Sequence, residues 1–250
     1  MARAFSVRLA ASVLTAAALC GTSQPGEKEK VGPDHKPIVE KGEIVLPVHK
    51  VKLEKDQLYY IEVKAKGFQP RVVIPGAFPG FAGFPPIKPG EFRTAFTPKE
   101  TKDYEIIMLP EFLGGGELPK GKPEYTLTVQ RAPKPILNVT DRWTDKDPKY
   151  TNDSYFKAYS IKMKAGETYI IDLVRAGKEL LDPYLFLEDK NKQVVDRDDD
   201  SGGNLNARIV FTPKTDGEHR IIATTLGLAT GEFTLTVRGL VAAEATTEKK

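Results

Sequence analysis

The sequence predicts an all-β protein made of two tandem antiparallel β-sandwich domains, jelly-roll-like, that follow a signal peptide. Apolar residues alternate with polar ones in many short segments, and Gly, Pro, Asn and Asp separate these segments at hairpin spacing. Three blocks of sequence also recur in the same order. A chain of 250 residues is long enough for two domains that each bury a core.

The N-terminus has the composition of a secretory signal peptide, which we assign to residues 1–20. A basic start precedes the apolar run from Leu9 to Leu19, which is too short to span a bilayer as a permanent helix. Cys20 raises the alternative of lipoprotein anchoring, which we do not favour because Leu19 stands where a small residue is needed. We expect the mature chain to be secreted, periplasmic or in the cell envelope, without a membrane-spanning segment.

Charge and cysteine content narrow the function classes. The formal net charge of +3 falls to +1 (3 − 2) when the two arginines of residues 1–20 are removed, so we expect no nucleic-acid partner. Cys20 is the only cysteine, which excludes a disulfide within the chain and leaves a packed core or bound ions as the source of stability. Residues 21–36 are predicted to form a flexible tether and residues 241–250 a disordered tail.

An internal repeat organises the rest of the chain. The matching pairs are His49–Gly67 with Tyr159–Gly177, Arg93–Met108 with Arg208–Ala223, and Glu124–Val129 with Glu232–Val237. Three matches in one order indicate two homologous domains, at residues 37–131 and 132–240, each an antiparallel sandwich of seven to nine strands.

The second domain resembles a known family. The segments "AGETYIIDL", "LDPYLFLED", "DRDDDSGGNLNARIVFTPKTDGEHRIIAT" and "GEFTLTV" are similar to the bacterial pre-peptidase C-terminal domain over Tyr155 to Gly239. The first domain resembles a degenerate copy, with "FQPRVVI" in place of "LDPYLFL" and no acidic loop. The resemblance implies a jelly-roll-like sandwich found beside secreted peptidases and other exported bacterial proteins.

The same resemblance implies a non-catalytic role in secretion, stability or substrate attachment, and some collagen-binding relatives hold calcium. No peptidase sequence accompanies the two domains here, so a secreted peptidase would have to be a separate partner. We therefore expect an exported accessory or adhesion protein whose partner is an extracellular protein or polysaccharide.

The histidines give little support for an enzyme. His35 lies in the tether, whereas His49 and His219 align with Tyr159 and Tyr104 of the opposite domains, which predicts partly exposed strand positions and not catalytic bases. The chain has no HExxH, GxSxG or phosphate-binding loop motif. We predict that the protein is not an enzyme. A hydrolase remains the third alternative, and it would need carboxylates of both domains to meet in a cleft.

An acidic loop in the second domain is the main candidate site. Its oxygen-bearing residues are candidate calcium ligands because calcium takes six to eight oxygens from a flexible loop. The candidate ligands are Asp182, Asp196, Asp198, Asp199, Asp200 and Asn204. From Asp182 to Asp200 seven acids oppose three bases, a net charge of −4, whereas Gly67 to Glu91 in the first domain carries +1. The acids are therefore not needed to form the sandwich.

Two hypotheses for this loop stay open. The carboxylates lie in a Gly- and Asn-rich turn, where we expect all of them to be hydrated and ionised, which argues against acid/base catalysis. They form either a weak calcium site or a solvated acidic turn. Asp182 belongs to the site only if the "LDPY" turn folds beside the loop, as the resemblance suggests.

The first domain has an apolar loop, "VVIPGAFPGFAGFPPIKPGEF", which holds Phe78, Phe81 and Phe84 among many glycines and prolines. Such a loop should not lie fully in water. It either folds onto its own sheet or the second domain, or forms a docking surface for a protein or polysaccharide. The second possibility gives an alternative function, a secreted binding module that uses these aromatic residues.

Overall fold

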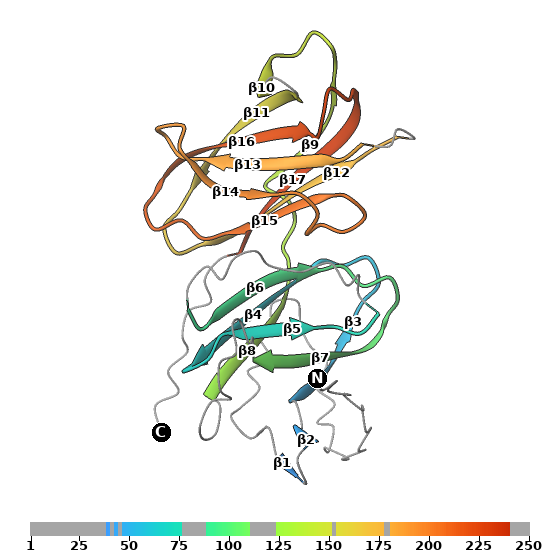
Figure 1. Ribbon diagram of the computed structural model, residues 1–250, viewed down its shortest axis with the longest axis vertical. Helices are drawn as coiled ribbons and strands as arrows, with labels where there is room; N and C mark the ends of the chain where they lie inside the picture. The colour runs from blue at the N-terminus through green and yellow to red at the C-terminus, as the bar shows by residue number, and fades with distance from the viewer. Residues whose placement is uncertain are drawn as a thin grey trace, which may run out of the picture.

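The computed structural model describes residues 39–40, 43–44, 47–76, 89–110, 124–151, 154–177 and 181–240. Within these ranges the regular elements are all strands, and all paired strands are antiparallel, which confirms the all-β class (Figure 1). The strands are β1 (Val39–Glu40), β2 (Glu43–Ile44), β3 (Val48–Leu53), β4 (Tyr59–Lys66), β5 (Pro70–Val73), β6 (Glu91–Phe96), β7 (Lys102–Pro110), β8 (Glu124–Arg131), β9 (Leu137–Trp143), β10 (Lys149–Thr151), β11 (Ser154–Met163), β12 (Thr168–Arg175), β13 (Pro183–Glu188), β14 (Val194–Asp198), β15 (Ala207–Phe211), β16 (Gly217–Thr225) and β17 (Gly231–Leu240).

Strands β3 to β8 form two three-stranded sheets, β3-β7-β5 and β6-β4-β8, which we call the N-terminal sheet pair. Alternate residues of both sheets meet in one core, as the period-two pattern predicts. Ile61 and Val63 of β4 are fully buried there against Ile106 of β7 and Leu127 of β8. Short β1 and β2 pair only with each other.

Strands β9 to β17 form the C-terminal sheet pair, with sheets β10-β11-β16-β13-β14 and β15-β12-β17-β9. Their core is larger and includes the only tryptophan of the chain. Trp143 is fully buried, stacks on Phe233 at a ring separation of 4.2 Å, and donates its indole N–H to the carbonyl of Ala223 at 2.9 Å. Both sheet pairs are β-sandwiches.

The internal repeat is also a repeat of strand order and register. The sheet order β3-β7-β5 corresponds to β11-β16-β13, and β6-β4-β8 corresponds to β15-β12-β17. Equivalent cross-strand pairs are Val51–Tyr104 and Ile161–His219, Tyr59–Phe96 and Tyr169–Phe211, and Ile61–Val129 and Ile171–Val237. The recurrence in sequence therefore encodes the same pairing in both sheet pairs.

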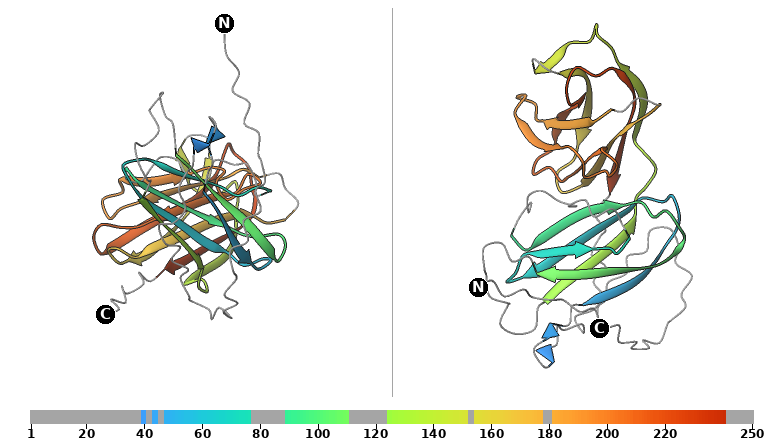
Figure 2. Two further views of the ribbon diagram at one scale, coloured as in Figure 1. Left: turned by 90° about the horizontal axis from the view of Figure 1, so that it is seen from below. Right: turned by 45° about the vertical axis from the view of Figure 1, so that its right-hand side comes forward.

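The two sheet pairs stack on each other through their facing sheets, so that four sheets follow one another along the molecule (Figures 1 and 2). Tyr60 and Ala95 of the N-terminal pair lie in one buried cluster with Ile170 and Leu240 of the C-terminal pair. This contact explains why β12 is buried on both faces, although a strand at the surface of a single sandwich would alternate.

A charged network accompanies this apolar contact. The buried carboxylate of Asp172 pairs with Arg208 Nε and with Arg238 Nη1, the latter at 3.2 Å. Arg208 Nη1 also donates to the carbonyl of Ala95 at 2.7 Å, across the contact between the sheet pairs. Arg208 thus takes part both in the ion pair with Asp172 and in the contact between the two sheet pairs.

The expected seven to nine strands per domain fit the C-terminal sheet pair, which has nine. The N-terminal pair has six in the described residues, because no described strand there corresponds to β9, β10 or β14. The division into domains at residues 37–131 and 132–240 stays a prediction. The signal peptide, Cys20, the tether over residues 21–36 and the tail over residues 241–250 lie outside the described residues.

Candidate functional site

The acidic loop connects β14 to β15, and Asp198 at the end of β14 holds it in shape. Asp198 Oδ2 accepts hydrogen bonds from the backbone N–H groups of Ser201, at 3.0 Å, and Arg208, at 2.8 Å. The Ser201 hydroxyl donates to Asp198 Oδ1. Both carboxylate oxygens of Asp198 are therefore used inside the loop, and this predicted ligand organises the backbone instead.

The tip of the loop is a tight hairpin turn that suits its Gly- and Asn-rich sequence. Asn204 and Leu205 both have positive φ angles, 56° and 61°, which is the backbone of a two-residue type I′ turn. The side chain of Asn206 ties the turn to β12, because its Oδ1 accepts from the backbone N–H of Arg175 at 3.0 Å. Asn204, a predicted ligand, is exposed at the tip of this turn.

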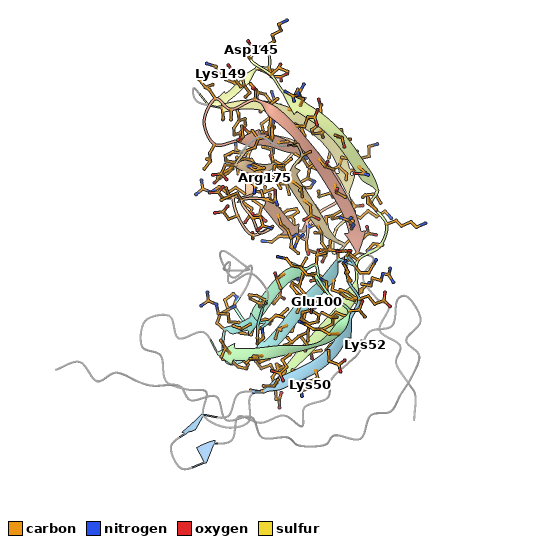
Figure 3. The ribbon with its side chains drawn as sticks, turned by 90° about the vertical axis from the view of Figure 1, so that its right-hand side faces the viewer. Lys50, Lys52, Glu100, Asp145, Lys149 and Arg175 are labelled. Carbon is orange, nitrogen blue, oxygen red and sulfur yellow. The ribbon has the colours of Figure 1, made fainter. Side chains whose placement is uncertain are left out.

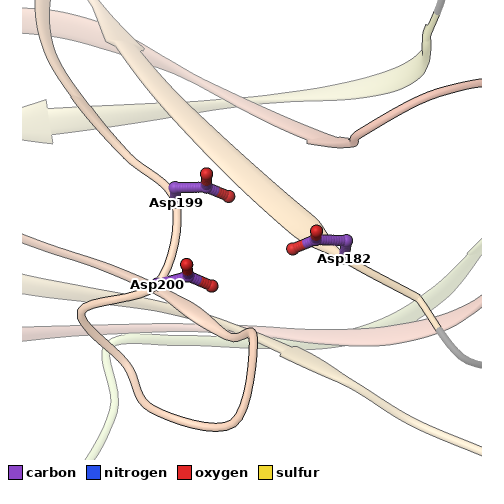
Figure 4. Close-up of side chains that lie close together, drawn as sticks. All are labelled: Asp182, Asp199 and Asp200. Carbon is purple, nitrogen blue, oxygen red and sulfur yellow. The ribbon is translucent and has the colours of Figure 1, made fainter. Parts of the chain in front are cut away.

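Three of the predicted ligands come together beyond the end of β14. One carboxylate oxygen from each of Asp182, Asp199 and Asp200 lies within 4.8 Å of the other two, and we call this group the acidic site (Figure 4). Asp182 precedes β13, and its backbone carbonyl accepts from the N–H of Leu226 at 2.8 Å, which ties the "LDPY" turn to the end of β16. The carboxylates of Asp182 and Asp199 point toward each other (Figure 4).

The acidic site concentrates negative charge in a partly dry place. One oxygen of Asp182 and one of Asp199 are buried without a hydrogen-bond partner among the described residues. Burial, followed by the charges of Asp200, Asp182 and Asp198, raises the pKa of Asp199 to about 6. Burial and the charge of Asp200 also raise the pKa of Asp182, against the lowering effect of Arg175. The protein therefore supplies too few hydrogen bonds and positive charges to stabilise the ionised forms of Asp182 and Asp199.

The expectation that every acid of the loop is hydrated is wrong for β14. Asp196 lies opposite Leu187 of β13, and burial raises its pKa to about 6. Burial also raises the pKa of Asp198, although hydrogen bonds from Ser201 and Arg208 oppose this effect. These two carboxylates lie on the face of β14 that is partly buried, opposite Leu187 and Leu185 of β13. The sequence resembles a polar turn and gives no sign of this burial.

The histidines also differ from expectation, since both described ones are buried and not partly exposed. His49 is 5% exposed and its Nε2 lies 2.8 Å from the hydroxyl of Tyr125 in the facing sheet. His219 is 8% exposed and its ring contacts that of Phe211 edge-on. Alignment with tyrosine was a poor guide to exposure, because Tyr104 is itself buried in the core.

Three residues that shape the acidic site were missed at the sequence level. Ser201 and Asn206 fix the loop, and Arg175 supplies a positive charge beside Asp182. The spacing Asp-x-x-Ser is a local signal for a side-chain turn that could have identified Asp198 and Ser201 as partners. No local pattern predicts Arg175, because its proximity depends on the packing of β12 against the loop.

The predicted contact residues Phe78, Phe81 and Phe84 lie outside the described residues, so the aromatic docking surface stays a prediction. In the part of the chain that the structure describes, no helix has the length and apolar character needed to cross a membrane.

Comparisons with known proteins add little. No protein-family model and no curated protein matches the chain. Solved structures with some likeness are the infectious bursal disease virus VP2 subviral particle (8% identity, 74% of this chain and 56% of that chain, TM-score 0.24) and the Gx strain of the same virus (10%, 78%, 56%, 0.22). The Gt strain gives 7% identity, 90% and 73% coverage, and a TM-score of 0.19. The chain spans 56% of the length of the first two, and TM-scores this low carry no argument about fold or function.

Proposed function

We propose that this chain is a non-catalytic exported accessory or adhesion protein whose C-terminal sheet pair is stabilised by calcium at the acidic site. The observation that supports the cation is the group of three carboxylates in which two buried oxygens lack a partner. The resemblance of residues 155–239 to a domain found beside secreted peptidases supports the accessory role.

The chemistry of the acidic site favours calcium over other divalent ions. Its candidate ligand atoms are all carboxylate oxygens, which suit hard cations, whereas zinc prefers nitrogen and sulfur. Two oxygens on one calcium lie at most about 5 Å apart, and one oxygen from each of Asp182, Asp199 and Asp200 lies within 4.8 Å of the others. Calcium also tolerates the irregular geometry of a loop, whereas magnesium requires a near-ideal octahedron.

Thermal unfolding with calcium and with a chelator tests this proposal. Extracellular calcium modules bind with dissociation constants of about 10⁻⁴ to 10⁻³ M, so about 10 mM calcium should stabilise the fold by about 1.4 to 2.7 kcal/mol. We expect a rise of several degrees in the melting midpoint of the wild type. We expect no rise for Asp199→Ala/Asp200→Ala or for Asp182→Ala.

The matched control is Asp145→Ala, because Asp145 is exposed at a turn at the outer end of the C-terminal sheet pair (Figure 3). This variant should respond to calcium as the wild type does. Equal midpoints of the wild type in calcium and in chelator would contradict the calcium site, and the loop would then be a solvated acidic turn. An equal response to magnesium would contradict the selectivity for calcium.

A further inference from the structure

Strand β8 ends the sheet β6-β4-β8 on one side, and among the described strands only β4 pairs with it (Figure 1). Hydrogen bonds of successive residues alternate between the two sides of an antiparallel strand. Ala132, just after β8, donates its N–H to the carbonyl of Leu58, just before β4, at 2.7 Å. Along the continuous register of β4 and β8, the outward backbone groups are therefore those of Tyr125, Leu127 and Val129. We call this outward side the β8 edge.

The equivalent edge in the C-terminal sheet pair is occupied. Glu124–Val129 of β8 and Glu232–Val237 of β17 are identical at five of six positions, and β17 pairs with β12 as β8 pairs with β4. On its other side β17 pairs with β9, which places Val139 opposite Leu235. Nearly the same sequence thus holds a further strand in one sandwich and has no partner on that side among the described strands of the other.

The repeat locates the part of the sequence that would take the place of β9. The first repeated block is offset by 110 positions (159 − 49), so Leu137–Trp143 correspond to residues 27–33. That stretch reads "EKEKVGP", with charged residues, glycine and proline where β9 has alternating apolar residues, and such a composition disfavours a strand. Strands β1 and β2, which come later, pair with each other. The sequence at the equivalent position therefore does not match β9.

Several other edges of the described sheets are blocked against further pairing. On β9 the backbone N–H of Arg142 is accepted by the Asp141 carboxylate at 2.7 Å, and on β14 the N–H of Arg197 is accepted by Asp196 at 2.8 Å. Strand β10 has only three residues, and β5 has four and begins with Pro70. Strand β8, in contrast, has eight residues and contains no proline, glycine or aspartate. Proteins block sheet edges that must stay unpaired, so an unblocked edge of this length is suited to pairing.

We propose that the β8 edge binds one extended segment of the protein that this chain accompanies, as an added antiparallel strand. The inference rests on the accessory role proposed above and names the kind of partner. As β9 does for β17, the segment should place apolar residues opposite Leu127 and Val129. It should place small polar residues opposite Thr126 and Thr128, since β9 has Thr140 and Asn138 at these positions. Main-chain hydrogen bonds then supply affinity, and the alternating side chains supply specificity.

The probe is a synthetic peptide with the sequence of residues 135–144, because this segment contains β9, which pairs with a nearly identical edge. Amide hydrogen exchange of the ¹⁵N-labelled full chain, followed by two-dimensional NMR, is measured with and without the peptide. At a peptide concentration of about ten times the dissociation constant, exchange should slow about tenfold at Leu127 and Val129, whose N–H groups point outward. Exchange at Thr126 and Thr128 should not change, because their N–H groups face β4. This alternation distinguishes strand addition from non-specific contact.

Thr126→Asp gives β8 the side chain that blocks β9 and β14. The new carboxylate would precede the outward N–H of Leu127, as Asp141 precedes the N–H of Arg142 that it accepts. Thr126 is exposed and lies opposite Lys64, so an aspartate there should leave the fold intact, as circular dichroism would show. We expect about tenfold weaker peptide binding. Thr126→Val is the matched control, because it adds no acceptor, and it should bind the peptide as the wild type does.

Several results would overturn the proposal. Absent or uniform slowing along β8, or wild-type affinity in Thr126→Asp, would show that no strand is added there. Slowing at Leu235 and Val237 instead would show that the peptide displaces β9. Peptide binding only after removal of residues 21–36 would assign the edge to the tether of this chain. Slowing at Leu127 that depends on protein concentration, without peptide, would assign the edge to a second copy.

Measurements in calcium and in chelator keep this proposal apart from the calcium site. Strand β8 belongs to the N-terminal sheet pair, so peptide binding should be equal in both conditions. Peptide binding by a protein that shows no calcium response would refute the calcium site and leave the β8 edge in place. A calcium response without peptide binding would do the reverse, so the two proposals fail separately.

Discussion

Asp198 and Asp199 are adjacent in the chain but have opposite relations to the fold. Both oxygens of Asp198 accept hydrogen bonds from the loop, whereas Asp199 has a buried oxygen without a partner among the described residues. Removing Asp198 leaves the N–H groups of Ser201 and Arg208 unpaired, and removing Asp199 relieves repulsion.

We therefore expect Asp198→Ala to destabilise the protein by about 2 kcal/mol in calcium and in chelator alike, from the loss of these hydrogen bonds. Asp199→Ala should leave stability in chelator unchanged or higher. Urea denaturation in chelator measures both effects. If the two variants lose the same free energy of unfolding, the distinction between an organising and a ligating carboxylate is wrong.

The raised pKa values of Asp196 and Asp199 predict how stability depends on pH. Each folded-state pKa is about 6, against an ordinary value of 3.8, so the folded protein binds protons more tightly than the unfolded chain. Stability in chelator should therefore fall as the pH rises from about 4 to about 6. Melting curves across this range should show a smaller fall in Asp199→Asn, and calcium should reduce the fall further. A midpoint that rises steadily from pH 4 to pH 6 in chelator and is unaffected by Asp199→Asn would contradict this prediction.

The β14–β15 hairpin depends on a glycine that approaches the opposite strand. A Cβ atom on Gly202 would lie 2.6 Å from the carbonyl oxygen of Asn206, which is closer than such atoms can approach. We expect Gly202→Ala to lower the free energy of unfolding by about 1 to 3 kcal/mol and to weaken calcium binding, since it shifts Asp199 and Asp200. Gly217→Ala is the control, because its Cβ would meet nothing within 4 Å and its φ is not positive. Equal stability of the two variants, measured by urea denaturation, would contradict this role for Gly202.

At the level of elements, the sequence predicted the strands well and their surroundings less well. Period two places Ile61, Ile171 and Val237 in the cores where the structure has them. The same local pattern predicted that every acid of the loop would be hydrated, because it does not show that Asp196 pairs with the buried Leu187 of β13. Only the family resemblance suggested that Asp182 lies near Asp199, because 17 positions (199 − 182) separate them in the sequence.

For the whole molecule, the buried carboxylate of Asp172 neutralises two arginines where the sheet pairs meet. We expect Asp172→Ala to destabilise the protein by about 3 kcal/mol, because Arg208 and Arg238 then face each other without an anion. Fluorescence of Trp143 reports the C-terminal core alone, and far-UV circular dichroism reports all strands. In the wild type both signals should share one denaturation midpoint, and in Asp172→Ala the midpoints should separate.

Asp103→Ala is the control for this comparison, because Asp103 is exposed on β7. It should leave both midpoints unchanged. A loss in Asp172→Ala no larger than in this control would show that the ion pairs do not stabilise the contact between the sheet pairs.

The stacking of the two sheet pairs could not be predicted from the sequence. Ile170 and Asp172 lie on the outer face of their own sandwich, and each is buried only because the N-terminal sheet pair covers it. Such a contact joins residues more than 70 positions apart, for example Arg208 and Ala95, and no local periodicity encodes it. The repeat, in contrast, can be read from the sequence, and its recurring segments form strands with the same order in both sheet pairs.

The equal registers of the two sheet pairs have a consequence for folding. A strand such as β4 finds in β15 and β17 nearly the same pairing edges and apolar positions as in its own partners β6 and β8. Tandem repeats of this kind misfold by exchanging equivalent strands within one chain. Refolding should then show a slow phase whose amplitude is independent of protein concentration, as trapped chains release strands that have inserted into the wrong sandwich.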